Sequence, residues 1–276
     1  YTIDRARGPI AGILDQGKQL LCSPMTPTIW RAPTDNDRRI KLEWAQAGYK
    51  NEQIKCYSCA LSEVTDTTAT VKASISMGGY MKAPFLHAEV LYTFYARGGV
   101  VLSYDVKVQS GLPNLPRFGV MFTMPEGSER LRYFGHGPIE SYIDKRLASR
   151  LGVFETLVSD HFEHYVRPQE NMAHADTQWA FVSNLSAHGL FFAKTEEDFS
   201  FNCSHYTPMQ LTETRHDYEL IPMKDTVVHL DARHNGIGSN SCGPTLHPDY
   251  QFNATAFRFS VRILPAFVNN VDPFEE

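Results

Sequence analysis

The chain has 276 residues, of which 42% are hydrophobic and 21% are charged, the balance of a globular protein with a substantial core. Its formal net charge of −5 argues against a nucleic-acid partner, because phosphate binding requires clustered Lys and Arg side chains. The sequence contains no apolar run of about 18 residues, so we expect no membrane partner. The chain starts at Tyr1 rather than at Met, and we expect it to be a fragment of a longer protein.

Alternating apolar and polar residues predict β-strands along most of the chain. The segment 36–48 has the clearest helical pattern, with Gly48 as its stop. Within 88–108, two runs rich in β-branched and aromatic residues flank Gly98 and Gly99, which tolerate the positive φ of a tight hairpin turn. Segment 139–164 is expected to add a turn or two of helix. Further strands are expected at 67–76, 117–124, 179–184, 188–193, 226–231 and 255–263.

Many short strands with few helices predict an all-β fold, a large antiparallel β-sandwich. No Pro-, Gly- or Ser-rich linker interrupts the series, so we expect residues 1–276 to form a single domain with an N-terminal hairpin attached to it. The terminal segment 271–276 is expected to be a solvated tail.

The five cysteines are scattered along the chain, and their number is odd. Cys56 and Cys59 form a C-x-x-C, but the flanking residues have a strand pattern and no second C-x-x-C follows, so a structural role is favoured over a redox pair or a zinc site. No histidine pair forms H-E-x-x-H, and we predict no metal site. This cysteine usage is compatible with a reducing compartment, which favours the cytoplasm over the periplasm.

Four segments are too polar to be plain strand. Each alone has an ordinary explanation as a turn or helix cap, yet together they place polar side chains beside Trp30, Tyr133, Tyr165 and Trp179. Sugars are bound by that mixture, with polar groups for the hydroxyls and aromatic faces for the ring. Loops at one end of a sandwich can converge on one site. The segments are "WRAPTDND" (30–37), "YFGHGPIESYIDKR" (133–146), "YVRPQENMAHADTQW" (165–179) and "DARHNGIGSNSCGP" (231–244).

Five ordered motifs make residues 8–264 similar to the C-terminal region, the small chain or domain 5, of family-2 β-galactosidases. They are "RAPTDND", "GHGPIESYIDKR", "YVRPQEN", "LTETRHDYEL" and "HLDARHNGIGSNSCGP". The resemblance implies a supersandwich like that of galactose mutarotases, packed against an upstream catalytic barrel of the same chain. Such a domain should expose an apolar patch where the barrel covers it.

The resemblance also implies what this chain lacks. A retaining glycosidase needs an acid/base carboxyl group and a nucleophilic carboxylate, and in this family both glutamates belong to the barrel. We therefore expect no catalytic residue here and no hydrolysis of galactosides by this chain alone. Mg and a monovalent cation would belong to the full-length enzyme, with no cofactor bound by this chain. The full-length enzyme is expected to be a homo-oligomer.

Two loops are predicted to form the rim of the substrate pocket. The resemblance implies a loop beside the active site with Arg167, Glu170 and Asn171 at its tip. Glu170 would contact a cation or a loop of the barrel; the alternative is a structural pair between Arg167 and Glu170. In the second loop, 239–243, some family members place a tryptophan that stacks on the sugar. Here Cys242 offers no aromatic ring, and Asn240 is the group expected to bind a hydroxyl.

The remaining polar residues are interpreted as scaffold. Arg31, Asp35 and Asn36 are expected to hold the entrance to the sandwich. Residues 211–220 combine strand character with charges that would line a domain interface. We expect four alternating residues to lie on one face of a strand and to form an internal salt bridge: Glu140, Tyr142, Asp144 and Arg146.

Two other functions stay open from the sequence. One is a carbohydrate-binding module, which would bind galactose without a barrel. The other is an aldose 1-epimerase-like enzyme, in which His136, His205 and Glu170 would supply acid–base catalysis. Fold alone does not choose among these functions.

Overall fold

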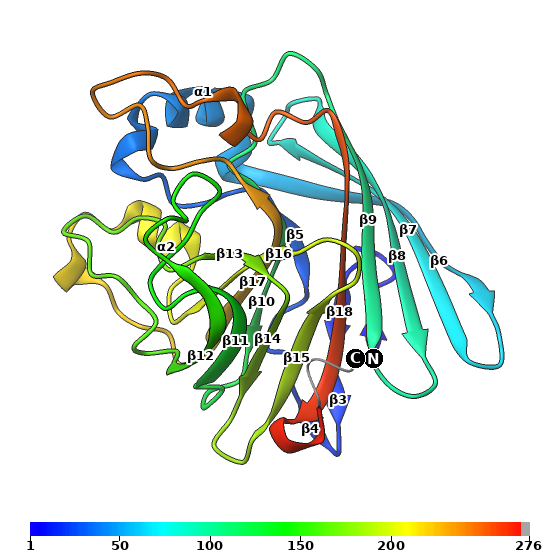
Figure 1. The fold of residues 1–276 in the computed structure, drawn as a ribbon. Helices are drawn as coiled ribbons and strands as arrows, with labels where there is room; N and C mark the ends of the chain where they lie inside the picture. Colours follow the sequence, from blue (N-terminus) through cyan, green and yellow to red (C-terminus); the bar gives the residue numbers. More distant parts are fainter. Residues whose placement is uncertain (272–276) are drawn as a thin grey trace.

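The computed structural model describes residues 1–271 and shows two stacked antiparallel β-sheets (Figure 1). The larger sheet has nine strands in the order β12-β11-β14-β15-β18-β9-β8-β7-β6. Its strands are β6 (Glu52–Val64), β7 (Thr68–Gly79), β8 (Pro84–Tyr95), β9 (Val100–Val108), β11 (Arg130–Gly137), β12 (Arg150–Leu157), β14 (Trp179–Ser183), β15 (His188–Lys194) and β18 (Ala256–Phe267).

The smaller sheet has five strands and covers part of the larger one. Its order is β13-β16-β17-β10-β5, with β5 at Thr26–Thr28, β10 at Arg117–Met124, β13 at His174–Thr177, β16 at Phe199–Ser204 and β17 at Thr226–His234. Two small hairpins join β1 (Thr2–Ile3) to β2 (Ile10–Gly12) and β3 (Leu14–Asp15) to β4 (Lys18–Gln19).

Helices are short and lie outside the sheets. The described part of the chain has two α-helices, α1 (Ile40–Ala47) and α2 (Pro208–Glu213). Single 3₁₀ turns lie at Asp35–Arg38, Tyr49–Asn51, Asp217–Glu219, Pro248–Tyr250 and Val268–Asn270. No helix among residues 1–271 is long and apolar enough to cross a membrane.

The core lies between the two sheets and is rich in aromatic rings. Phe122 on β10 packs against Phe192 on β15, with ring centroids 5.9 Å apart, and Tyr104 on β9 meets Phe118 on β10 at 5.6 Å. All four side chains are buried. The alternation of buried and exposed residues along β8 and β9 follows from this packing, because successive side chains of a strand point to opposite faces.

One edge of the larger sheet is formed by β12. This strand pairs with β11 along its whole length, and no other strand within residues 1–271 pairs with it. Its outward side chains include Leu151, Val153 and Leu157, which are 49%, 43% and 42% exposed. The edge therefore combines unpaired backbone groups with apolar side chains.

Most of the sequence-based predictions of structure are confirmed. An all-β antiparallel sandwich forms, with strands in every expected segment, a hairpin at the N-terminus and a helix that ends at Gly48. The helical turns expected within 139–164 are wrong, because that region supplies β12 and irregular loops. The C-x-x-C lies on β6, as predicted, and both thiols are free. Of the predicted tail 271–276, residues 272–276 lie outside the described part of the chain.

Strand pairing brings the predicted site segments to one end of the smaller sheet. Gly119 on β10 pairs with Thr28 on β5 and with Asp231 on β17. Because both neighbours run antiparallel to β10, the chain leaves β5 and β17 at the same end, beside the start of β10. Figure 1 shows the segment around α1 and the loop after β17 together at this end.

Candidate functional site

Arg117, the first residue of β10, is the centre of a buried ionic cluster at this end. Its side chain has no solvent exposure. Its guanidinium nitrogens lie 3.6 Å from a Glu170 carboxylate oxygen and 3.7 Å from an Asp231 carboxylate oxygen. A third nitrogen contacts the ring of His229, whose Nε2 is 2.9 Å away. One guanidinium therefore faces two carboxylates and an imidazole away from water.

The β17 residues of the cluster keep defined charges. Burial alone would raise the pKa of Asp231, but Arg117 and the hydrogen bond from His234 Nε2 at 3.0 Å outweigh it and hold that pKa below its usual value. Burial and then Arg117 lower the pKa of His229 well below its ordinary value, so this ring is a neutral partner. Gly119 makes room for them, since a Cβ there would lie 2.2 Å from an Asp231 oxygen.

The 165–173 loop contributes Glu170 and Asn171 to the cluster. Asn202 on β16 donates to a Glu170 carboxylate oxygen at 3.3 Å and to the Asn171 carbonyl at 2.8 Å. The Asn171 side chain donates to the Gln169 carbonyl at 2.9 Å and accepts from the Glu163 backbone at 3.1 Å. Glu170 and Asn171 are 3% and 4% exposed. Their polar groups are satisfied within the domain.

Segment 31–37 connects the two predicted site loops. Toward the first loop, the Glu170 N–H donates to the Ala32 carbonyl at 3.1 Å, and the Asp35 N–H donates to the Gln169 side chain at 3.0 Å. Toward the second loop, Asn36 donates to the Ile237 carbonyl at 2.6 Å. The segment therefore fixes both loops at once.

Arg31 holds this connecting segment from inside. Its guanidinium is fully buried, pairs with Asp37 at 2.9 Å and donates to the Asn235 carbonyl of the second loop. Asp37 in turn accepts from the Thr34 N–H at 2.9 Å. Arg31, Asp35 and Asn36 have the predicted scaffold role, because together they contact both loops.

The 138–149 loop forms a second connection of the same kind. Glu140 accepts from the Met172 N–H at 3.0 Å in the first loop, whereas Asp144 accepts from the Ile237 and Gly238 N–H groups at 3.0 and 2.7 Å in the second. Burial, and then Glu170 and Glu140, raise the pKa of the Tyr142 hydroxyl well above its ordinary value. Tyr142 therefore lies among these carboxylates as a neutral group.

This 138–149 loop corrects one sequence-based prediction and confirms another. Glu140, Tyr142, Asp144 and Arg146 do not lie on a strand face, because β11 ends at Gly137 before Pro138, which has no N–H for a ladder. The expected internal salt bridges are present, from Lys145 to Glu140 and from Arg146 to Asp176. Residues 211–220 are likewise not strand, since they form the end of α2 and the turn Asp217–Glu219.

The cavity beside Glu170 is small. About 10 Å³ is enclosed among Glu170, Asn171, Asn202 and His229, roughly the space of one water molecule. A sugar-sized ligand needs a site of about 300 Å³ or more. The cluster itself therefore positions the loop, and a galactoside would have to lie outside it.

The five predicted rim residues separate into two groups. Glu170 and Asn171 are buried in the cluster, while Arg167 and Cys242 are exposed and Asn240 is half-buried in the second loop. Glu170 forms a buried structural ion pair, but its partner is Arg117 rather than the expected Arg167. Whether any of the five contacts substrate stays a prediction.

The predicted aromatic platform is not available to a sugar. Trp30, Tyr133 and Trp179 are 5%, 1% and 3% exposed and belong to the core. Tyr165 is half-buried, and its hydroxyl donates to Glu140 at 2.7 Å. These rings lie beside polar residues in the sequence but are buried in the fold, because large aromatic side chains gain the most free energy from burial.

The structure does not bring the three residues of the epimerase hypothesis into one site. His136 faces Ser149 at 3.1 Å, His205 contacts Glu129 at 2.9 Å, and Glu170 pairs with Arg117. Each group therefore has its own partners. Among residues 1–271, no group of three or more His, Cys, Asp or Glu side chains is arranged to hold a metal ion.

Sequence reasoning missed Arg117, His229 and Asn202, the strand residues on which the loop rests. The available signal was a charged or polar side chain inside a strand pattern, since a buried charge needs a partner. Arg117 opens the run 117–124 and was treated only as strand, whereas Asp231 was counted in the polar segment 231–244 without a partner being predicted for it.

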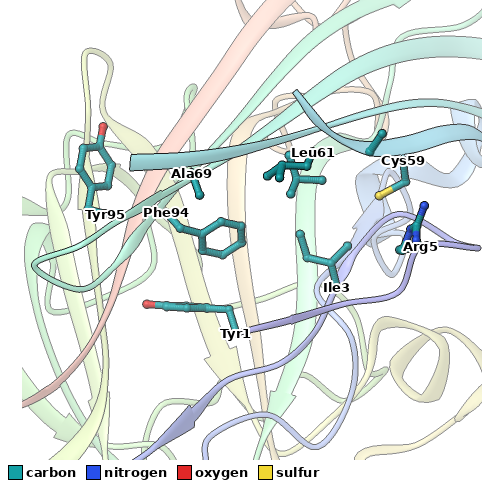
Figure 2. Close-up of a pocket in the computed structure, with 10 residues that line it drawn as sticks. Tyr1, Ile3, Arg5, Cys59, Leu61, Ala69, Phe94 and Tyr95 are labelled. Atoms are coloured by element: carbon teal, nitrogen blue, oxygen red, sulfur yellow. The ribbon is translucent and has the colours of Figure 1, made fainter. Parts of the chain in front are cut away.

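A larger hollow lies elsewhere, under the N-terminal segment. Figure 2 shows Tyr1 and Ile3 facing Phe94 and Leu61 of the larger sheet, and the rings of Tyr1 and Phe94 are 5.1 Å apart. The hollow has a volume of about 620 Å³ and shares no lining residue with the two site loops. It is a mainly apolar groove between β1 and the part of the sheet formed by β6, β7 and β8.

The fold and this site define a β-sandwich domain whose loops are tied together by buried ion pairs. The chain belongs to the β-galactosidase small chain family, whose model matches residues 1–263. A β-galactosidase of Staphylococcus xylosus is 34% identical over 263 residues, and one of Actinobacillus pleuropneumoniae is 34% identical over 259. These alignments cover 95% and 94% of this chain but 26% and 25% of the relatives, so the chain spans about a quarter of their length.

Two solved structures align with most of this chain at low similarity. A putative aldose 1-epimerase from Escherichia coli K12 aligns with 96% of this chain and 81% of its own, at 11% identity and a TM-score of 0.41. An aldose epimerase homologue from C. elegans aligns with 96% of this chain at 8% identity and a TM-score of 0.38. Likeness at this level says nothing about activity.

Proposed function

We propose that this chain is the part of a β-galactosidase that completes the rim of the active site, and that the rest of a longer protein hydrolyses terminal β-D-galactosides with retention. The observation that carries the proposal is the family match over residues 1–263 in a chain that spans only a quarter of its relatives. The catalytic barrel of the same protein is then the main partner, and the galactoside is bound between the two parts.

The geometry of the loop cluster supports the assignment of catalysis to the barrel and of the pocket rim to this chain. Retaining hydrolysis needs two carboxyl groups about 5–5.5 Å apart across the scissile bond. In this cluster Glu170 and Asp231 neutralise Arg117, and Glu140 is bound by Lys145, Tyr165 and the Met172 N–H. These carboxylates hold the loops in place, so the catalytic pair is assigned to the barrel. Mg and a monovalent cation, and the homo-oligomeric assembly, are likewise assigned to the full-length enzyme.

The direct test is hydrolysis of an aryl β-galactoside by this chain alone and by the longer protein. We expect no activity from the chain alone. In the longer protein, Asn240→Gly, which suits the positive φ of 80° at that position, and Arg167→Ala should each lower kcat/KM about tenfold, the loss of one hydrogen bond worth about 1.4 kcal/mol, with little change in the unfolding midpoint. Arg258→Ala, which removes an arginine that is 86% exposed on β18, is the matched control and should retain full activity.

The buried loop residues need a separate comparison. Glu170→Ala and Asn171→Ala remove groups of the ionic cluster, so the unfolding midpoint of each variant must be measured together with its activity. Loss of kcat with unchanged folding would support a role of the loop in the active site. Hydrolysis by the chain alone would overturn the proposal, as would full activity of both the Asn240 and the Arg167 variants.

A further inference from the structure

Two buried histidines close the base of the loop that carries Glu170 and Asn171. His161 precedes this loop and His174 follows it as the first residue of β13, and the two are 1% and 0% exposed. Their Nε2 atoms are 2.6 Å apart. Residues 162–173 therefore leave and rejoin the domain at a single imidazole–imidazole contact, which is defined here as the histidine latch.

The latch has more hydrogen-bonding contacts than hydrogens when both rings are neutral. His161 Nδ1 lies 2.8 Å from the Cys203 carbonyl, and His174 Nδ1 lies 2.8 Å from the His136 carbonyl. A carbonyl only accepts, so both Nδ1 atoms must carry hydrogen. The Nε2–Nε2 contact needs a third hydrogen, but two neutral imidazoles have only two N–H groups. One of the three hydrogen bonds is therefore unmade in the neutral pair.

The groups that surround the latch offer no negative charge to hold an extra proton. Tyr133 on β11 stacks on His174 with ring centroids 4.2 Å apart, and Cys203 lies on β16. Burial raises the pKa of both the Tyr133 hydroxyl and the Cys203 thiol, so both stay neutral. His136 on β11 contributes its carbonyl, while its ring turns to Ser149.

Burial controls the protonation of both rings. It lowers the pKa of His161 to about 4, and burial together with His161 lowers the pKa of His174 well below its ordinary value. The carbonyl contacts oppose these shifts only in part, and no carboxylate of residues 1–271 contributes to either. The closed pair is therefore uncharged at neutral pH.

We propose that the His161–His174 pair is an acid-opened latch, closed while both rings are neutral and opened when separated, hydrated rings take up protons. Protons bind more tightly to a hydrated ring, with a pKa of about 6.5, than to a ring in the closed pair. The stability of the closed state is thus fully present above pH about 6.5 and is lost as the pH falls toward 4. One proton shared across the Nε2–Nε2 contact would supply the third hydrogen, but a second proton would leave that contact without an acceptor nitrogen, so the closed pair can hold fewer protons than two separated rings.

The expected size of the effect follows from these two pKa values. For His161 alone, lowering the pH from 7 to 5 should raise the ratio of open to closed loop about 20-fold, given a closed-state pKa of about 4 and an open-state pKa of about 6.5. Protonation of His174 in the open state adds to this, and charge repulsion between the two rings then opposes reclosure.

Amide hydrogen exchange between pH 7.5 and 5, corrected for the intrinsic exchange rate, tests the latch. Protection of amides within 162–173 should fall at least tenfold over this range, while amides of β8 and β9 keep theirs. His161→Gln and His174→Gln each keep a donor but cannot titrate, so each single variant should reduce the pH dependence of the loop and the double variant should abolish it. His205→Gln is the matched control, because His205 bonds Glu129 and the Asp225 carbonyl outside this loop, and should behave as wild type.

A second measurement needs no variant. Exchange of the imidazole C2 hydrogen in the wild-type protein reports the pKa of each histidine, and His161 and His174 should titrate below the exposed histidines. The latch is refuted if either ring titrates near 6.5 in the folded protein, or if loop protection is unchanged from pH 7 to 5. The latch goes beyond the proposed function, because loop exchange reports on it and galactoside hydrolysis does not.

Discussion

The loop of Glu170 and the loop of Asn240 belong to the same end of the sandwich, yet they are held in opposite ways. The first is fixed along its length by buried side chains, with Glu170 on Arg117 and Asn171 under Asn202. The second is fixed at its neck, where Asp144 accepts from the Ile237 and Gly238 N–H groups, and beyond it Cys242 is exposed.

The difference shows which part of each loop is free to meet another molecule. Polar groups satisfied inside the domain position a loop, and breaking their bonds to reach a ligand would cost about 1–3 kcal/mol each. Groups that are accessible to solvent, on either loop, can bind another molecule without that cost. Arg167, Asn240 and Cys242 are therefore better candidates for outside contacts than Glu170 and Asn171.

The largest expected loss of stability comes from disrupting the buried ionic cluster that holds the first loop. Arg117→Met leaves Glu170 and Asp231 buried without their cation and should destabilise the protein by about 3–5 kcal/mol in urea unfolding. Arg167→Met removes an exposed arginine from the first loop and should change stability by less than about 0.5 kcal/mol. Similar values for the two variants would show that the ionic cluster does not hold the loop.

A smaller effect is expected at the neck of the second loop. Asp144→Asn keeps one acceptor oxygen but loses the charge and one of the two hydrogen bonds. The free energy of unfolding should fall by about 1–2 kcal/mol. Amide exchange should accelerate in 236–243 and stay unchanged in 165–173. Asp249→Asn is the matched control, since that side chain is 80% exposed. Faster exchange in both loops would mean that they move as one unit.

The smallest effect concerns thiol chemistry and leaves stability untouched. With a disulfide reagent at pH about 8, Cys242 on the exposed tip should react within the folded protein. Cys203 is buried, and burial raises the pKa of its thiol, so it should react only on unfolding. Protection of Cys242 in the longer protein would identify this tip as a contact surface; equal rates for Cys242 and Cys203 would contradict the described burial.

Local patterns predicted the fold well because strand alternation and turn chemistry act over a few residues. The β8–β9 hairpin follows from its alternation and from Gly98 and Gly99, whose φ angles are 98° and 86°. The helical interpretation of 139–164 failed because pairing with β11 decides that segment, and this partner is not visible in a local pattern.

The candidate site was predicted only in part, for a related reason. The sequence indicated the four loops and their polar residues. It could not indicate that Glu170 meets Arg117 from another strand, or that Asp144 reaches Gly238, because these contacts join residues far apart in the chain. Trp30 and Trp179 were expected near a ligand, but their surface is more favourably buried in the core.

The exposed edge at β12 has a practical consequence for work with this chain. Unpaired backbone groups beside Leu151, Val153 and Leu157 are the combination by which separate molecules add strands to one another and aggregate. Natural edge strands often carry an inward-facing charge or a lysine that prevents such association, whereas the charges of β12 are Arg150 at its first position and Glu155, and both are exposed. Concentration-dependent association through intermolecular sheets is therefore the main hazard when the chain is prepared by itself.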